Sequence, residues 1–250
     1  MKAIIEWQSK KIEIDFSAGI DLSLPLQNGE ANPNAFHIPF PLFEPIKVGD
    51  FVGAVSQGSS ANCENLFINA HGNGTHTECI GHITLERNTI NGCLTDFHCM
   101  AQVVSLALVQ TENGDAVIPL ANAQNWLNQN VDAVVIRSLP NEPGKKLQQY
   151  SGNNPGYLSA ELCHFFAVNK IKHLLVDLPS VDREEDGGAM AAHKAFWQYP
   201  EQPRMAATIT EMAFVPNEVP DGIYFLNLQI ASFESDASPS KPVLYALKLV

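Results

Sequence analysis

Residues 71–82 read HGNGTHTECIGH and contain three of the eight histidines of the chain. In an extended segment, residues two apart face the same side, so His76 and Glu78 can converge on one point. The glycines allow tight turns of the backbone, which would bring His71 to the same point. Imidazole nitrogens with a carboxylate oxygen suit Zn²⁺ or Mn²⁺. The stretch therefore favours a metal site over the alternative, a hydrogen-bonded loop of polar residues.

The residues around this stretch predict a β-rich α/β chain. Clusters of glycine, proline and asparagine separate short apolar runs that are typical of strands. Residues 65–69 form one such run directly before the histidines, and we interpret it as a buried strand. Further strands are predicted at residues 11–16, 103–109, 133–136, 173–176, 222–230 and 243–250. Helices are predicted at residues 122–127, 158–166 and 190–197.

The composition excludes several classes of protein. The chain has 250 residues, of which 45% are hydrophobic, so it can bury a full core. Its 15 basic and 27 acidic residues give a net charge of −12, which argues against binding to nucleic acid. No apolar stretch reaches the roughly 18 residues of a membrane span, and Lys2 and Glu6 interrupt any signal peptide. Five cysteines without a C-x-x-C pair fit a reducing cytoplasm, where we expect the protein.

The histidine stretch also resembles a known signature. Residues 74–78 (GTHTE), followed by His82, resemble the pattern H-x-G-T-H-x-D-x-P-x-H of the cyclase family of metal-dependent hydrolases, which includes kynurenine formamidase and isatin hydrolase. The resemblance continues in the family's order from about residue 20 to residue 245. Residues 19–26 (GIDLSLPL) are similar to its N-terminal I-D-L-S-x-P-L, and residues 177–182 (DLPSVD) to its D-x-x-S-x-D strand end.

Three departures from the family pattern lie at the motif itself. Four residues separate His71 from His76, where the family has three, so Gly72 occupies the strict position of the first ligand. We assume that the loop carries one extra residue and that His71 still reaches the metal. Glu78 replaces the usual aspartate, and Ile80 replaces the proline. A carboxylate moved by one methylene could retune the choice of metal or reduce the site from two metals to one.

The resemblance implies a set of site residues that spacing alone does not reveal. By themselves, His193 would be a core or surface histidine and Glu211 a strand-end carboxylate. The implied metal ligands are His71, His76 and Glu78 for one ion, with Glu78 shared by a second ion held by His193 and Glu211. His82 would move a proton as the catalytic acid–base group. Ser180 and Asp182 would contact the substrate, although a loop-capping role suits their residue types equally.

The resemblance also implies a fold and an activity. We expect residues 1–250 to form a single domain of the β-rich swivelling β/β/α type, assembled as a homo-oligomer. The expected activity is arylformamidase-like hydrolysis of an amide C–N bond in a small molecule, as in tryptophan catabolism, through a water activated by Zn²⁺ or Mn²⁺, two ions per chain. One alternative is a cyclic-amide (lactam) hydrolase of the isatin type. The other is a family member that binds a metal or small ligand without catalysis.

Overall fold

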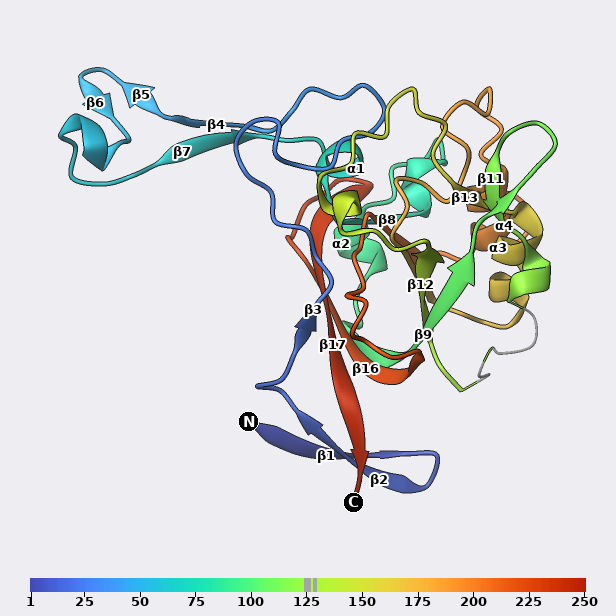
Figure 1. The fold of residues 1–250 in the computed structure, drawn as a ribbon. Helices are drawn as coiled ribbons and strands as arrows, with labels where there is room; N and C mark the ends of the chain where they lie inside the picture. Colours follow the sequence, from blue (N-terminus) through green and yellow to red (C-terminus); the bar gives the residue numbers. More distant parts are fainter. Residues whose placement is uncertain (124–126, 128–129) are drawn as a thin grey trace.

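Seven strands form a closed barrel in the computed structural model, which describes residues 1–123, 127 and 130–250 (Figure 1). The strands pair in the order β17-β16-β9-β12-β14-β15-β8, and β8 pairs with β17 to close the ring. They are β8 (His76–Cys79), β9 (His98–Ala107), β12 (Ala133–Leu139), β14 (His173–Val176), β15 (Thr208–Glu211), β16 (Gly222–Ile230) and β17 (Ala237–Leu249). The barrel is mixed: β9, β12, β14 and β15 are parallel, and the remaining pairings are antiparallel.

Two helices cover the outside of the parallel strands. Helix α3 (Ala160–Val168) lies in the connection from β12 to β14, and α4 (Ala191–Trp197) in the connection from β14 to β15. Their large side chains Phe166, Phe196 and Trp197 are fully buried against the strands. Because helices cover one face and the barrel interior the other, residues 133–136 of β12 and 174–176 of β14 are apolar and buried, as predicted from the sequence.

The interior of the barrel is filled by the alternate residues of the same strands. Val135 and Leu175 point away from the helices and pack with Leu226 and Leu244 from the antiparallel side. The predicted β-rich α/β fold is thus confirmed, with a closed mixed barrel at its centre. The predicted helices at 158–166 and 190–197 correspond to α3 and α4. The predicted helix at 122–127 lies largely outside the described residues.

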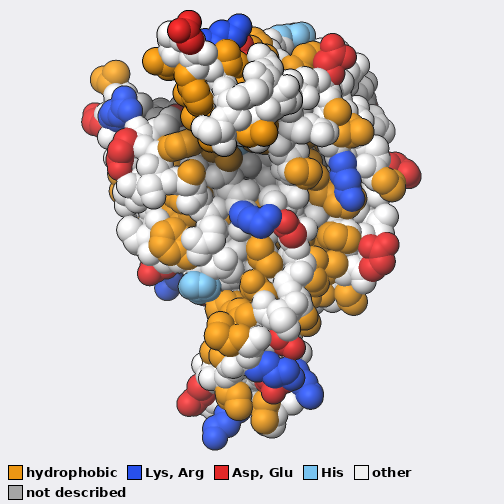
Figure 2. Space-filling model, turned by 90° about the vertical axis from the view of Figure 1, so that its left-hand side faces the viewer, with side chains coloured by type: hydrophobic (Ala, Val, Ile, Leu, Met, Phe, Trp, Pro, Cys, Tyr) orange, Lys and Arg blue, Asp and Glu red, His pale blue; other side chains and the backbone are white. Residues whose placement is uncertain are grey.

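An arm formed by residues 40–67 projects from the barrel (Figure 1). Strands β4 (Leu42–Pro45) and β7 (Glu64–Phe67) pair along its length, and β5 (Lys47–Val48) pairs with β6 (Phe51–Val52) towards its tip, which also carries a short 3-10 helix, η1 (Val55–Gln57). Figure 2 views the molecule from the side of the arm tip and shows hydrophobic side chains on the arm surface.

The arm corrects one sequence-based interpretation. Residues 65–69 were expected to form a buried strand, but every residue of β7 is exposed. Its one partner strand is β4, and no layer of the described structure covers either face of this two-stranded ribbon. A short apolar run therefore indicated a strand correctly but not its burial, because burial depends on what packs against the strand.

The N-terminal residues form a second projection at the opposite end of β17. Strands β1 (Lys2–Trp7) and β2 (Lys10–Asp15) form a hairpin, and β2 continues the sheet along the end of β17. Strand β3 (Ile20–Asp21) pairs with the middle of β17. Residues 11–16, whose alternating pattern predicted a strand with one face in solvent, lie largely in β2, where buried and partly exposed residues alternate. Among the described residues, no helix has the length and apolar character required to cross a membrane.

Short elements complete the molecule, and two of them carry residues of the histidine stretch. The first is α1 (Ala70–Asn73) and the second is the 3-10 helix η2 (Ile80–His82). They flank β8 in sequence, so the stretch forms a helical turn, a barrel strand and a second helical turn. The others are α2 (Ile90–Cys93), β10 (Val109–Gln110), β11 (Ala116–Ile118), η3 (Leu120–Asn122), η4 (Pro143–Leu147) and β13 (Tyr157–Leu158).

Candidate metal centre

Strand β8 presents two candidate ligands on one face. His76 and Glu78 are fully buried, as their spacing of two in an extended segment predicts. The residue between them faces the other side, where the hydroxyl of Thr77 lies 2.7 Å from that of Thr210 on β15. The strand register places His76 opposite Glu211. Backbone pairing on both edges of β8 therefore fixes the position of these two side chains.

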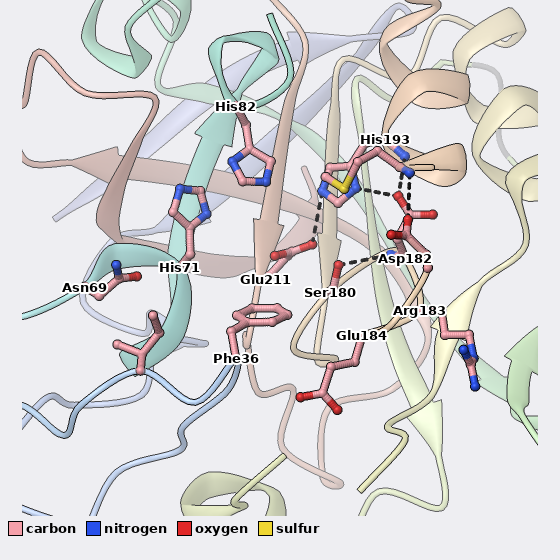
Figure 3. A pocket seen from close by; sticks show the side chains of 13 residues that line it. Phe36, Asn69, His71, His82, Ser180, Asp182, Arg183, Glu184, His193 and Glu211 are labelled. Carbon is pink, nitrogen blue, oxygen red and sulfur yellow. Dashed lines mark hydrogen bonds and ion pairs between the residues drawn. The ribbon is translucent and has the colours of Figure 1, made fainter. Parts of the chain in front are cut away.

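The carboxylate of Glu78 lies at the centre of a group of imidazoles. Its Oε1 is 3.0 Å from Nε2 of His193. Its Oε2 is 3.2 Å from Nδ1 of His71 and 3.8 Å from Nδ1 of His82. The structure thus brings together residues from α1, β8, η2 and α4 around one buried carboxylate. Figure 3 shows the three imidazoles, those of His71, His82 and His193.

Helix α1 brings His71 to this centre despite the extra residue in the loop. The side chain of Asn69 accepts a hydrogen bond from the backbone N–H of Gly72 and begins the turn. A Cβ on Gly72 would lie 2.6 Å from Cγ1 of Ile38, so the backbone can approach that closely only with glycine here. The turn packs Gly72 against Ile38 and directs His71 towards Glu78. The extra residue therefore does not keep His71 away from Glu78.

Helix α4 supplies His193, and Asp182 holds it in place. The Oδ1 atom of Asp182 accepts a hydrogen bond from the backbone N–H of Ala192 at 2.7 Å, which caps the start of α4. Its Oδ2 lies 2.6 Å from Nδ1 of His193, so the other ring nitrogen faces Glu78. Ser180 accepts a hydrogen bond from the backbone N–H of Asp182. Asp182 thus orients His193, in addition to its place on the cavity wall.

Glu211 closes the buried side of the group. Its Oε1 accepts a hydrogen bond from the backbone N–H of Val181 at 2.8 Å and lies 3.8 Å from Nε2 of His193. Its Oε2 lies 3.3 Å from Nε2 of His76. All five residues expected to hold metal, together with His82, are therefore neighbours in one cluster.

Two buried atoms of the cluster make no hydrogen bond of good geometry, although each lies within ion-pair distance of another side chain. They are Nε2 of His76 and Oε2 of Glu78. Buried polar atoms are almost always satisfied, so such a pair requires an explanation. An imidazole nitrogen and a carboxylate oxygen are typical ligands of Zn²⁺ and Mn²⁺. The donor set therefore fits a divalent cation.

Two groups of three residues around Glu78 have the required geometry. His71, His76 and Glu78 form one group, and Glu78, His82 and His193 form another. In each group the three ligand atoms lie within 4.8 Å of one another. Glu78 belongs to both groups, and the second contains His82, whereas the ligand set implied by the family resemblance has Glu211.

The charges of the cluster also prepare it for a cation. Burial alone would lower the pKa of His71, but hydrogen bonds with Asp236 and Glu78 raise it to about 10. Burial likewise opposes the protonation of His193, but Glu78 and Asp182 raise its pKa to about 10. Burial would raise the pKa of Glu78, yet His82 and His193 hold it well below its ordinary value. Protons on His71 and His193 balance the carboxylates in the metal-free chain.

Asp236 is a member of the cluster that sequence reasoning missed. Its Oδ2 lies 2.9 Å from Nε2 of His71 and 3.2 Å from Nδ1 of His82. It directly precedes β17, and its carbonyl oxygen accepts a hydrogen bond from the backbone N–H of Cys79. No motif in the sequence marks this residue, because it meets the histidines only when β17 pairs with β8.

A cavity of about 360 Å³ opens beside the cluster. His71, His82 and His193 face it on one side (Figure 3). Phe36, Ile38 and Met190 form an apolar wall, and Ser180, Asp182 and Arg183 contribute polar groups. The volume suits a small organic molecule.

These observations define a class of protein: a β-rich α/β barrel with a buried His/Glu cluster beside a cavity for a small molecule. The model of the family described as "Putative cyclase" matches residues 20–183. This match covers more than half of the chain, so the chain belongs to that family. No protein with a curated description matches the sequence.

Solved structures share the whole fold. A structure described as a potential metal-dependent hydrolase with cyclase activity has a TM-score of 0.65 at 17% identity, covering 91% of this chain and 98% of that chain. For a predicted metal-dependent hydrolase from Bacillus stearothermophilus the TM-score is 0.63 at 16% identity, and the match covers 91% of this chain and 97% of that chain. For an isatin hydrolase bound to the product analogue thioisatinate the TM-score is 0.65 at 13% identity, and the match covers 92% of this chain and 93% of that chain. The TM-scores and the coverage show a common fold.

Proposed function

We propose that the protein is a metal-dependent hydrolase that cleaves an amide C–N bond in a small molecule, in the manner of an arylformamidase. The observation that carries this proposal is the pair of buried atoms without a well-formed hydrogen bond, Nε2 of His76 and Oε2 of Glu78, within a cluster of imidazoles beside a cavity. Membership of the cyclase family and the fold of metal-dependent hydrolases support it.

Five residues would hold the metal. His71, His76 and Glu78 would bind one ion, and His193 and Glu211 would bind a second that shares Glu78. Zn²⁺ and Mn²⁺ both suit this set of nitrogen and oxygen donors. A divalent cation bound here supplies a Lewis acid and lowers the pKa of a bound water towards neutrality.

The remaining residues of the site would orient the substrate and move protons. His82 lines the cavity and has Nδ1 engaged with Asp236, so Nε2 is the ring atom that would exchange a proton with the reacting groups. The apolar wall of Phe36, Ile38 and Met190 would hold the apolar part of the substrate and exclude water. Ser180 would contact the substrate directly. Asp182, expected from the sequence to do the same, would act mainly through His193.

Metal analysis combined with a substrate panel tests this function. The purified protein is analysed for Zn²⁺ and Mn²⁺ per chain, and then assayed with aryl formamides and with lactams. Two ions per chain with hydrolysis of formamides supports the proposal. The absence of bound metal after loading with either ion would overturn it.

Hydrolysis of a cyclic amide is the second candidate function. Two isatin hydrolase structures share the fold at TM-scores of 0.65 and 0.63. Turnover of lactams without turnover of formamides would favour this candidate. Tight metal binding without turnover of either class would instead favour a family member that binds metal or a small ligand without catalysis.

We also propose that the chain assembles with copies of itself through the arm. Seven large apolar side chains of the arm are between 37% and 67% exposed: Phe40, Leu42, Val48, Phe51, Val55, Leu66 and Phe67. A two-stranded ribbon is at best marginally stable alone, so an apolar ribbon of this kind requires a covering surface. Light scattering should show a dimer or larger assembly, and replacing Leu66 and Phe67 with serine should reduce its mass. A monomeric wild type would contradict this proposal.

A further inference from the structure

The outer side of the histidine cluster depends on one carboxylate that lies far away in the sequence. Asp236 is separated from His71 by 165 residues and from His82 by 154. The same oxygen, Oδ2, faces both imidazoles, at 2.9 Å from Nε2 of His71 and 3.2 Å from Nδ1 of His82. The two rings lie side by side with their centroids 4.4 Å apart and their planes at 31°.

The backbone holds this carboxylate in place. The carbonyl oxygen of Asp236 accepts from the N–H of Cys79 at 3.0 Å, and the carbonyl oxygen of Ser235 accepts from the N–H of Ile90 at 2.7 Å. The hydroxyl of Ser235 donates to Oδ1 of Asp236 at 3.1 Å. Because the serine engages Oδ1, Oδ2 is the atom left for the histidines.

Each ring nitrogen that faces Asp236 determines what the other nitrogen of that ring can do. A neutral imidazole carries one proton, and a carboxylate keeps that proton on the nitrogen facing it. For His71, a proton on Nε2 leaves the lone pair on Nδ1, the atom that lies 3.2 Å from Oε2 of Glu78. For His82, a proton on Nδ1 leaves the lone pair on Nε2.

We propose that Asp236 is a positioning residue which selects the ring tautomers of both His71 and His82. This inference rests on the proposed function, because it assigns His71 to the metal and His82 to proton transfer. The carboxylate presents Nδ1 of His71 to the metal, which compensates for the extra residue between His71 and His76. It also leaves Nε2 of His82 ready to accept a proton. Carboxylates that bind the second nitrogen of a metal-bound histidine commonly strengthen metal affinity in this way.

The test compares the wild type with Asp236→Asn in the intact chain, with Zn²⁺ as the probe. Asparagine preserves the shape of the side chain but removes the charge that holds the two protons. The affinity for Zn²⁺, measured by competition with a chelating dye, should fall about 10- to 100-fold. At saturating Zn²⁺ the number of ions per chain should equal that of the wild type. The value of kcat should fall while KM changes little, because Asp236 does not line the cavity.

Glu234→Gln is the matched control. Glu234 lies two residues before Asp236 and anchors the same segment through Thr89 and Asn91, without a contact to an imidazole. Its replacement should leave the Zn²⁺ affinity and kcat at wild-type values. An equal loss in both variants would show that Asp236 acts only by ordering the segment, and would overturn the proposal.

Histidine ring ¹⁵N NMR of the Zn²⁺-loaded wild type tests the tautomers directly, without a variant. His71 should carry its proton on Nε2 and His82 on Nδ1. The opposite tautomer of His82 would overturn the proposal, and so would an unchanged Zn²⁺ affinity in Asp236→Asn. Loss of a whole ion from Asp236→Asn at saturating Zn²⁺ would also overturn it, because Asp236 would then be a metal ligand. A wild type that binds no Zn²⁺ would instead overturn the proposed function, and the inference with it.

Discussion

The candidate site has an inner and an outer half, and the two halves are built differently. The side chains of the inner half, His76, Glu78, His193 and Glu211, are at most 3% exposed. Those of the outer half, His71, His82 and Asp236, are between 22% and 33% exposed. Barrel strands and a capped helix supply the inner residues, whereas single helical turns and a strand end supply the outer ones.

The difference suits the two tasks that we propose for the site. Buried ligands with fixed backbones can hold a cation in a constant geometry, because neither water nor side-chain rotation competes with them. Partly exposed imidazoles can exchange protons with solvent and with a molecule in the cavity. We therefore expect substitutions in the inner half to change metal content. In the outer half we expect His82 to affect the rate, whereas His71, as a proposed ligand, and Asp236, which orients it, should also affect metal binding.

The largest effect is expected from His76→Ala. This change removes a fully buried ligand atom that makes no hydrogen bond, so metal binding should be abolished. Elemental analysis of the purified variant gives the measurement. His173→Gln is the control, because His173 is also a buried strand histidine but bonds to Thr208, outside the cluster. Full metal occupancy of His76→Ala would remove β8 from the site assignment.

Glu211→Gln should produce the next largest effect. The amide nearly preserves the shape and can still accept the hydrogen bond from Val181, but it removes the charge that offsets a second cation. Metal content should fall from two ions per chain to one, and activity should collapse. If the wild type and the variant both bind one ion, the site is mononuclear and Glu211 is not a ligand.

His82→Ala should separate the two halves most clearly. Metal content should stay near the wild-type value, because the inner ligands are intact, while the rate of hydrolysis falls about 100-fold or more with the loss of an acid–base group. Steady-state kinetics on a slow substrate, with parallel metal analysis, gives both quantities. An unchanged rate would remove His82 from the catalytic residues.

The smallest expected effect is a release of protons when metal binds. His71 and His193 have pKa values of about 10 in the metal-free chain, so both are protonated at pH 7.0 and must lose a proton to bind a cation. Metal affinity should therefore increase as the pH rises towards the pKa of these histidines. Calorimetric titration with Zn²⁺ in buffers of different ionisation enthalpy counts the protons. Binding without proton release would contradict the protonated state of both imidazoles.

The inner and outer halves also differed in how far the sequence predicted them. Period-two alternation was sufficient to place His76 and Glu78 on one face, because it depends only on local backbone geometry. His193 and Glu211 were identified through the family resemblance, since their own surroundings carry no signal. Asp236 was missed, because a contact made across 165 residues leaves no local pattern. The burial predicted for residues 65–69 failed for the same reason: it depends on distant partners.

The pairing of β8 with β17 also bears on how the protein matures during synthesis. Residues 76–79 leave the ribosome early, but the register that closes the barrel joins Glu78 to Ala237. Until that last strand emerges, one edge of β8 has no partner, and a nascent chain would expose it together with the carboxylates and imidazoles. Contacts of such long range form late because the loop between them must first be ordered. The His/Glu cluster is therefore completed only after β17, the strand that Asp236 directly precedes, has been synthesised.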